Sequence, residues 1–134
     1  MEVKQLIEKA KEVQNNSYSP YSKFKVGAAL LTKDGKCFTG CNVEISSYTP
    51  TCCGERTAFF KAISEGYKEF DKIAIIGDVP FCPPCGVCRQ VMSEFCDKDF
   101  KIYLTDGIDY KEYTLEQMLP YAFNLEDWIW KCMI

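Results

Sequence analysis

Two short cysteine-containing segments constrain this chain more than any other feature. They read Cys53-Gly54-Glu55-Arg56 and Pro84-Cys85-Gly86-Val87-Cys88. Each precedes a stretch of helical periodicity, so the cysteines fall at helix N-termini, where unpaired N–H groups and the helix dipole favour thiolates. Three thiolates around one zinc ion leave its fourth tetrahedral position open, whereas structural zinc sites usually have four protein ligands. We therefore expect Cys53, Cys85 and Cys88 to bind Zn²⁺ at a chemically active site.

The residues beside the first cysteine suit such a site. The chain contains no histidine, which removes the commonest general base and excludes Ser-His-Asp triads and His-Glu-x-x-His proteases. Glu55 is therefore expected to carry protons between a metal-activated water and a substrate. Arg56 is expected to donate hydrogen bonds to ligand sulfurs and so to offset the negative charge of three thiolates.

Size and composition indicate a single domain spanning residues 1–134. The chain is 47% hydrophobic and 26% charged, as is ordinary for a globular protein. A net charge of −3 argues against polymeric nucleic acid as a partner, because binding a phosphate backbone needs clustered Lys and Arg. No apolar run approaches the ~20 residues that cross a bilayer, and no signal segment is evident. Nine cysteines, an odd number, suit a reducing compartment, so we expect a cytoplasmic protein without a membrane partner.

Hydrophobic periodicity and turn residues predict an alternation of helices and strands. The first half of the chain is expected to form a helix over 3–13, strands over 26–32 and 36–41 joined across Asp34-Gly35, and a helix over 53–66. A strand over 72–76 should follow, and then a helix after Pro84 with Val87, Val91, Met92 and Phe95 on one side. The last expected elements are strands over 101–105 and 110–114, and a short helix that is capped by Thr114 and Gln117 and ended by Pro120. The strand over 72–76 should be buried on both faces. The pattern predicts an α/β fold, a three-layer α/β/α arrangement with a mixed β-sheet of about five strands.

Over nearly its whole length the chain resembles the cytidine deaminase family, in its small three-cysteine branch. Besides the two cysteine segments, with Arg89-Gln90 after the second, the resemblance rests on Tyr18-Ser19-Pro20-Tyr21-Ser22-Lys23-Phe24-Lys25-Val26-Gly27-Ala28, Asn42-Val43-Glu44 and Leu119-Pro120-x-x-Phe123. It implies a cytidine deaminase-like fold, a Zn²⁺ cofactor, and a homotetramer with sites shared between subunits. It also implies hydrolytic deamination of cytidine and deoxycytidine to uridine and deoxyuridine, a reaction of pyrimidine salvage.

The same resemblance assigns roles to single residues. An activated water attacks C4 of cytosine while Glu55 protonates N3 and then assists the departure of ammonia. Asn42 and Glu44 contact the sugar hydroxyls, which is chemically reasonable because residues two apart on a strand face the same side. The aromatic residues complete the implied site: Phe24 packs against the pyrimidine, Tyr48 lines an intersubunit site, and Phe123 reaches into a neighbouring subunit's pocket.

Some residues depart from the family pattern and leave two alternatives open. Gly54 and Ser46 stand where the family usually carries alanine. Cys52 or Cys82 would, as a fourth ligand, turn the site into a structural zinc module without catalysis. We expect neither to bind, because neighbouring side chains at a helix start diverge by about 100° and prolines follow Cys82. The second alternative is a deaminase of another aminopyrimidine nucleoside such as blasticidin S, although Asn42-x-Glu44 favours an ordinary ribose.

The carboxyl-terminal stretch, Trp128 to Ile134, is unusually apolar for a chain end. It predicts a segment that packs against the core or in a subunit interface. We favour the interface.

Overall fold

The computed structural model describes residues 1–125, and its elements follow the predicted order. They are α1 (Val3–Gln14), β1 (Gly27–Thr32), β2 (Cys37–Cys41), α2 (Gly54–Ser64), β3 (Phe70–Ile76), α3 (Gly86–Phe95), β4 (Lys101–Thr105), β5 (Tyr110–Thr114) and α4 (Leu115–Met118). The main difference in bounds is at β3, which begins at Phe70, ahead of the predicted strand. The capping box of Thr114 and Gln117 at the start of α4 is confirmed.

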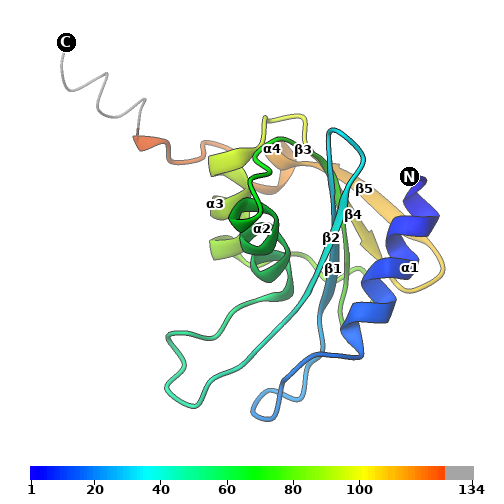
Figure 1. The fold of residues 1–134 in the computed structure, drawn as a ribbon, viewed down its shortest axis with the longest axis vertical. Helices are drawn as coiled ribbons and strands as arrows, with labels where there is room; N and C mark the ends of the chain where they lie inside the picture. The colour runs from blue at the N-terminus through cyan, green and yellow to red at the C-terminus, as the bar shows by residue number, and fades with distance from the viewer. Residues whose placement is uncertain (126–134) are drawn as a thin grey trace.

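The strands form one sheet in the order β2-β1-β3-β4-β5. Strands β3 and β4 are parallel, and the other neighbouring pairs are antiparallel, so the sheet is mixed as predicted. The β1–β2 hairpin turns at Asp34-Gly35. Gly35 has a φ of 92°, which residues other than glycine rarely adopt. Helix α1 covers one face of the sheet, and α2 and α3 cover the other (Figure 1). The three-layer α/β/α arrangement is therefore confirmed.

Strand β3 lies at the centre of both layers of the core. Ile73 and Ile75 pack on the side of α2 and α3, whereas Ala74 and Ile76 pack on the side of α1. All four are buried, which confirms the prediction of a strand covered on both faces. Burial on both faces explains why its sequence is almost continuously apolar.

A close backbone contact between β2 and α2 fixes the start of the second helix. A side chain at Gly40 would place its Cβ 2.4 Å from the Ala58 nitrogen and 2.5 Å from the Gly54 carbonyl oxygen. Only glycine permits this approach. A methyl at Gly54 would itself lie 3.2 Å from Val26 Cγ1. The first turn of α2, which carries Glu55, is thus held directly against the sheet.

Helix α3 differs from its prediction in one respect. Met92 is fully buried and Val91 and Phe95 are partly buried against the core, as expected, but Val87 in the first turn is 58% exposed. Helical spacing identifies a common face, but it does not show where the neighbouring elements stop covering that face.

The apolar stretch from Trp128 to Ile134 lies outside the described residues. Within residues 1–125, no helix has the length and apolar character needed to cross a bilayer.

Candidate functional site

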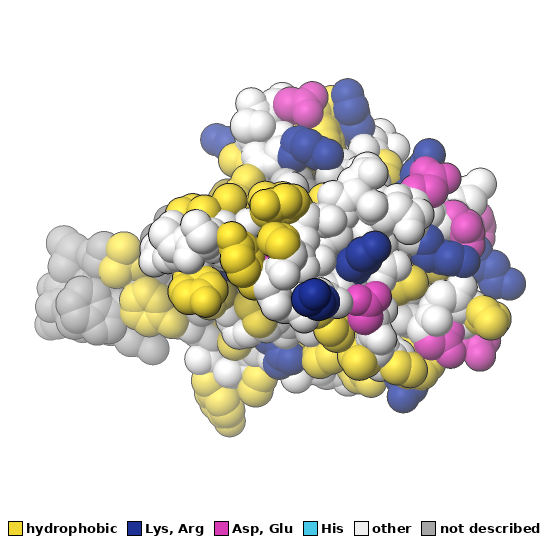
Figure 2. Space-filling model, turned by 90° about the horizontal axis from the view of Figure 1, so that it is seen from below, with side chains coloured by type: hydrophobic (Ala, Val, Ile, Leu, Met, Phe, Trp, Pro, Cys, Tyr) yellow, Lys and Arg dark blue, Asp and Glu magenta, His cyan; other side chains and the backbone are white. Residues whose placement is uncertain are grey.

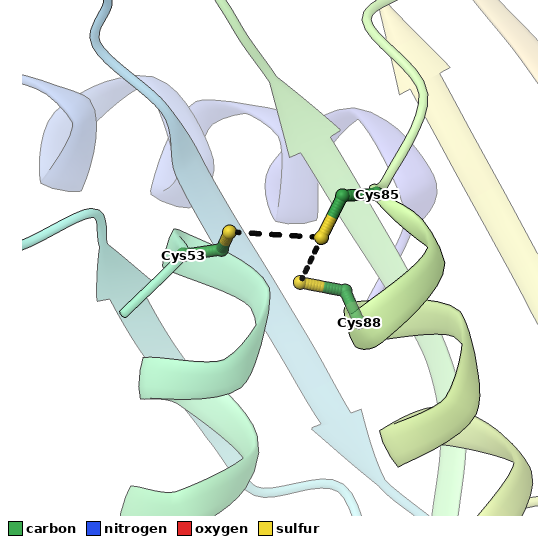
Figure 3. Close-up of side chains that lie close together, drawn as sticks. All are labelled: Cys53, Cys85 and Cys88. Carbon is green, nitrogen blue, oxygen red and sulfur yellow. Dashed lines mark hydrogen bonds between the residues drawn. The ribbon is translucent and has the colours of Figure 1, made fainter. Parts of the chain in front are cut away.

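The three cysteines predicted as ligands meet between the first turns of α2 and α3 (Figure 3). Cys53 is the N-cap of α2 and Cys85 is the N-cap of α3, both with extended backbone, while Cys88 lies one turn into α3. The Cys53 and Cys85 sulfurs are 3.8 Å apart, and those of Cys85 and Cys88 are 3.5 Å apart. These separations are far longer than a disulfide bond. The three sulfurs form a compact cluster of free thiols.

The geometry of this cluster fits zinc. Ligand sulfurs about 2.3 Å from a tetrahedral zinc ion are roughly 3.8 Å from one another, close to the separations observed between these thiols. Both helices direct their N-termini toward the cluster, so their dipoles stabilise thiolates there. Hydrogen bonds from Cys88 and Arg56 lower the pKa of Cys53 to about 5. The donor set and its surroundings therefore suit a soft divalent cation.

Arg56 lies where the sequence predicted it. Its guanidinium donates a hydrogen bond to the Cys53 sulfur at 3.3 Å. Burial alone lowers the pKa of an arginine, but here the hydrogen bonds to Cys53 and Cys88 outweigh burial and raise it. Arg56 thus places a permanent positive charge against the ligand sulfurs.

Among the described residues, neither Cys52 nor Cys82 belongs to the sulfur cluster. The backbone of Cys52 forms a β-bridge with Val43. The Cys82 thiol lies 3.8 Å from the Pro83 carbonyl oxygen. Within residues 1–125, the cluster thus consists of Cys53, Cys85 and Cys88.

Glu55 occupies the first turn of α2 and is only 4% exposed. Burial raises the pKa of its carboxyl group, and this effect outweighs the hydrogen bond from the Cys88 thiol, which lowers it. A carboxyl group with a raised pKa can both accept and release a proton near neutral pH. Glu55 therefore combines the position and the proton affinity of an acid–base group.

A cavity of about 270 Å³ opens beside the cluster. Predicted site residues on its wall are Phe24, Asn42, Glu44, Cys53, Glu55 and Cys85, and residues not predicted there include Ser22, Thr51, Cys82 and Pro83. Ser22 belongs to the Pro20-Tyr21-Ser22-Lys23-Phe24 segment, on which the family resemblance partly rests. Membership of that segment was the signal that could have identified Ser22 as a site residue. Other hollows, of about 590 and 550 Å³, do not border the sulfur cluster.

Asn42 and Glu44 reach this cavity from the chain that follows β2. Both side chains are buried, each 8% exposed, and both bind the segment that carries Phe24. Asn42 donates to the Phe24 carbonyl oxygen at 2.8 Å and accepts from the Val26 amide at 3.0 Å. Glu44 accepts from the amide and the hydroxyl of Ser22, and these bonds lower the pKa of its carboxyl group. Glu44 is therefore ionised at neutral pH.

Three residues considered in the sequence lie away from the cavity wall. Tyr48 is 74% exposed, with a positive φ of 66°, and its ring makes an edge contact with Tyr21. Phe123 is 60% exposed, and its carbonyl oxygen accepts a hydrogen bond from Gln90. Ser46 is also exposed. Within one chain, the structure does not bring Tyr48 and Phe123 to the cavity.

The chain was compared with known proteins. The model of the cytidine and deoxycytidylate deaminase zinc-binding region matches residues 1–104. Cytidine deaminase from Sporosarcina psychrophila is 48% identical over 129 residues, which cover 95% of each chain. The crystal structure of cytidine deaminase from Burkholderia pseudomallei has a TM-score of 0.88 and 46% identity, and the match covers 92% of this chain and all of that one. Blasticidin-S deaminase from Bacillus cereus is less similar, at 29% identity over 129 residues, which cover 90% of this chain and 91% of that one.

Proposed function

The chain belongs to the cytidine and deoxycytidylate deaminase family, and from this membership we propose how its own residues carry out the reaction. The protein is a zinc-dependent cytidine deaminase. It hydrolyses the amino group of cytidine and deoxycytidine, giving uridine or deoxyuridine and ammonia. The observation that carries the assignment of residues is that Glu55, Cys53 and Cys85 share one cavity with Asn42 and Glu44.

Cys53, Cys85 and Cys88 would hold the zinc ion. When bound, zinc supplies a Lewis acid that lowers the pKa of water toward neutrality. Glu55 accepts a proton from water and delivers it to N3 of the pyrimidine ring. The oxygen of that water adds to C4. Glu55 then moves the remaining proton of this oxygen to the amino group, so that the C4–N bond breaks, a C4 carbonyl forms and ammonia leaves. Burial of Glu55 supports this role because a raised pKa favours return of the proton.

The other cavity residues hold the nucleoside. We assign Phe24 to the flat face of the pyrimidine, because an aromatic ring packs well against a base. We assign Asn42 and Glu44 to the sugar hydroxyls. Asn42 retains an amide hydrogen that is not used toward Phe24, and Glu44 has carboxylate lone pairs left to accept from a hydroxyl.

Two other functions fit the structure less well. A purely structural zinc site needs a fourth protein ligand, and no fourth cysteine, aspartate or glutamate joins the cluster within residues 1–125. Deamination of another aminopyrimidine nucleoside, such as blasticidin S, would use the same metal ligands. The Asn42 and Glu44 pair favours a substrate with sugar hydroxyls.

We also propose a cytoplasmic homotetramer whose sites are shared between subunits. The support is that the aromatic residues Tyr48 and Phe123 are exposed, and that the loops before β1 and after β2 expose apolar side chains. Figure 2 shows hydrophobic side chains gathered on this face of the molecule. In those loops the exposed apolar side chains are Tyr18, Tyr21, Val43, Ile45 and Tyr48. Contact between subunits would cover them. The eight cysteines of the described part are free thiols, the state that a reducing compartment maintains.

The reaction is tested with purified, zinc-loaded protein and cytidine. We expect the ultraviolet absorbance of the cytosine ring to fall as uridine forms. Glu55→Gln should keep its zinc and its fold but lose turnover, because it removes only the proton-carrying group. Blasticidin S, offered at the same concentration, should be converted more slowly than cytidine. Turnover at the normal rate in Glu55→Gln would refute the role given to Glu55.

A further inference from the structure

The Glu44 carboxylate is held almost entirely by one short loop. Its Oε1 accepts from the Tyr21 amide at 3.1 Å and from the Ser22 amide at 3.0 Å, and its Oε2 accepts from the Ser22 hydroxyl. Two of the three donors belong to Ser22. The orientation of the carboxylate plane therefore depends on this serine, because the terminal torsion of a glutamate has only a broad intrinsic preference.

The same hydroxyl also reaches the aromatic wall of the cavity. The Phe24 amide donates to Ser22 Oγ at 3.1 Å, while that hydroxyl donates its own proton to Glu44. Asn42 holds the other side of the same residue, because its side-chain amide donates to the Phe24 carbonyl oxygen. The backbone of Phe24 is thus fixed between Ser22 and Asn42, two polar residues of the cavity wall. Ser22 itself lines the cavity, so its hydroxyl lies where a bound ligand would meet Glu44.

We propose that Ser22 is a positioning residue for nucleoside recognition, which orients the Glu44 carboxylate toward a sugar hydroxyl and joins it to the segment that carries Phe24. This inference rests on the proposed function. Ser22 acts through Glu44, whereas Glu55 lies in the first turn of α2 beside the cysteines. Loss of the Ser22 hydroxyl should weaken binding of the sugar and leave the proton transfers by Glu55 intact.

The test compares three variants of the zinc-loaded full chain. Ser22→Ala removes the hydroxyl, and Ser22→Thr keeps it. Ser19→Ala is the matched control, because it removes a serine hydroxyl of the same loop that, within residues 1–125, hydrogen-bonds to Ser17 and not to Glu44. We expect Ser22→Ala to raise KM for cytidine roughly tenfold and to change kcat by less than about twofold, since a hydrogen bond to a charged group is lost. Ser22→Thr should restore most of the affinity, and Ser19→Ala should resemble the wild type.

A substrate lacking the sugar hydroxyls separates positioning from a general effect. For 2′,3′-dideoxycytidine, the inhibition constant against cytidine should be nearly the same in wild type and Ser22→Ala, because Glu44 then has no hydroxyl to bind. In a Glu44→Ala background, Ser22→Ala should add no further loss. Melting curves should show that each variant folds. If Ser22→Ala does not fold, Ser22→Cys, which offers a weaker donor, replaces it and must give the same contrast.

Several results would overturn the inference. An unchanged KM in Ser22→Ala would do so, as would an equal loss of affinity for dideoxycytidine. A loss that persists in the Glu44→Ala background would indicate direct contact of Ser22 with the substrate. Failure of the proposed function is distinguishable, because the wild-type protein would then not convert cytidine at all.

Discussion

Arg56 donates a hydrogen bond to the Cys53 sulfur at 3.3 Å, from one turn further along the same helix. Its Nε is buried and has no hydrogen-bond partner within the described residues. A buried guanidinium is costly unless it is paired with negative charge. The arginine therefore fits a cluster of thiolates, which it partly neutralises, better than a cluster of neutral thiols.

Arg56→Gln tests this relationship. Glutamine retains polar character but removes the positive charge, so we expect zinc affinity to fall roughly 10- to 100-fold, as is typical when a group that hydrogen-bonds a ligand is lost. Competition with a chromophoric chelator measures the affinity. Arg56→Lys keeps the positive charge but lacks the planar guanidinium group, so its zinc affinity should lie between those of the wild type and Arg56→Gln. Wild-type affinity in Arg56→Gln would mean that the helix dipoles alone offset the charge of the sulfurs.

The cysteines should divide into two groups when each is replaced by serine. Replacement of Cys53, Cys85 or Cys88 removes a ligand and should abolish stable zinc binding, whereas Cys52→Ser and Cys82→Ser should retain one zinc ion per chain. Native mass spectrometry or elemental analysis gives the stoichiometry. Zinc loss in Cys52→Ser or Cys82→Ser would instead indicate that this cysteine is a fourth ligand and that the zinc site is structural.

The sequence could predict the zinc ligands because helix geometry is local. Cys85 and Cys88, three residues apart at a helix start, face the same side regardless of the rest of the fold. The β1–β2 hairpin was likewise predictable from Asp34-Gly35. Both predictions depend on residues close together in the chain, and the structure shows the Cys85 and Cys88 sulfurs together and β1 paired with β2.

Contacts between distant segments could not be predicted in the same way. The bonds of Ser22 to Glu44 connect two loops whose approach depends on the bridge between Tyr18 and Val43. No periodicity marks such a contact in advance. Exposure of Val87 has a similar origin, since spacing on a helix does not reveal how far the covering elements extend. The roles of Tyr48 and Phe123 stay predictions, because they concern a neighbouring subunit.

Gly77 packs behind Phe24 and Cys82, two residues of the cavity wall. A Cβ at this position would lie 2.8 Å from the Cys82 Cβ, 2.9 Å from the Cys82 sulfur and 3.1 Å from Phe24 Cε1. Gly77→Ala should therefore push one or both side chains into the cavity and lower kcat/KM for cytidine by roughly tenfold, the scale of a small overpacking strain. Steady-state kinetics measures this change.

A second substitution provides the control for Gly77. Cys82→Gly removes both the Cβ and the sulfur that the new methyl would meet, so the Gly77→Ala/Cys82→Gly double variant should recover much of the lost activity. Non-additivity of this kind is expected for side chains in direct contact. Additive losses would show that the alanine acts through the backbone of β3 instead.

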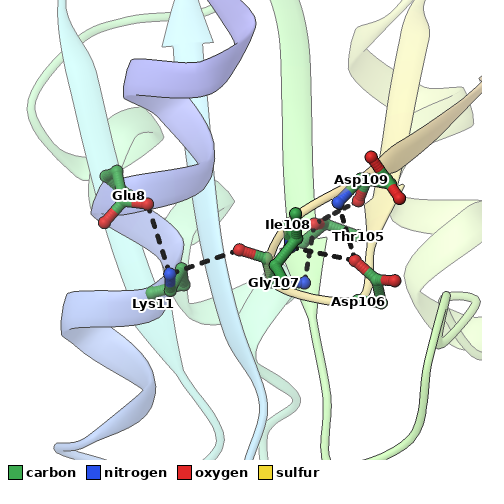
Figure 4. Close-up of polar contacts among 7 residues, drawn as sticks. All are labelled: Glu8, Lys11, Thr105, Asp106, Gly107, Ile108 and Asp109. Carbon is green, nitrogen blue, oxygen red and sulfur yellow. Dashed lines mark hydrogen bonds and ion pairs between the residues drawn. The ribbon is translucent and has the colours of Figure 1, made fainter.

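The loop between β4 and β5 offers a test of pH dependence away from the zinc site. Asp106 accepts from the Ile108 amide at 2.9 Å and from the Asp109 amide at 2.7 Å, and these bonds hold the pKa of its carboxyl group below the ordinary value of 3.8. Lys11 of α1 donates to the Gly107 carbonyl oxygen at 3.2 Å, which links the same loop to the first helix (Figure 4).

Because the pKa of Asp106 is lower in the folded state than in the unfolded state, its charge adds stability above pH 3.8. That contribution is lost as pH falls through the lower, folded value. Asp106→Asn keeps the turn but not the charge, so we expect a small drop in melting temperature at pH 7, of no more than about 3 °C for an exposed group. The drop should persist at pH 5 and shrink below pH 3.8. Asp99→Asn, at an exposed aspartate with no side-chain hydrogen bond in the described part, is the matched control. An equal drop at every pH would show that the carboxylate charge does not stabilise this turn.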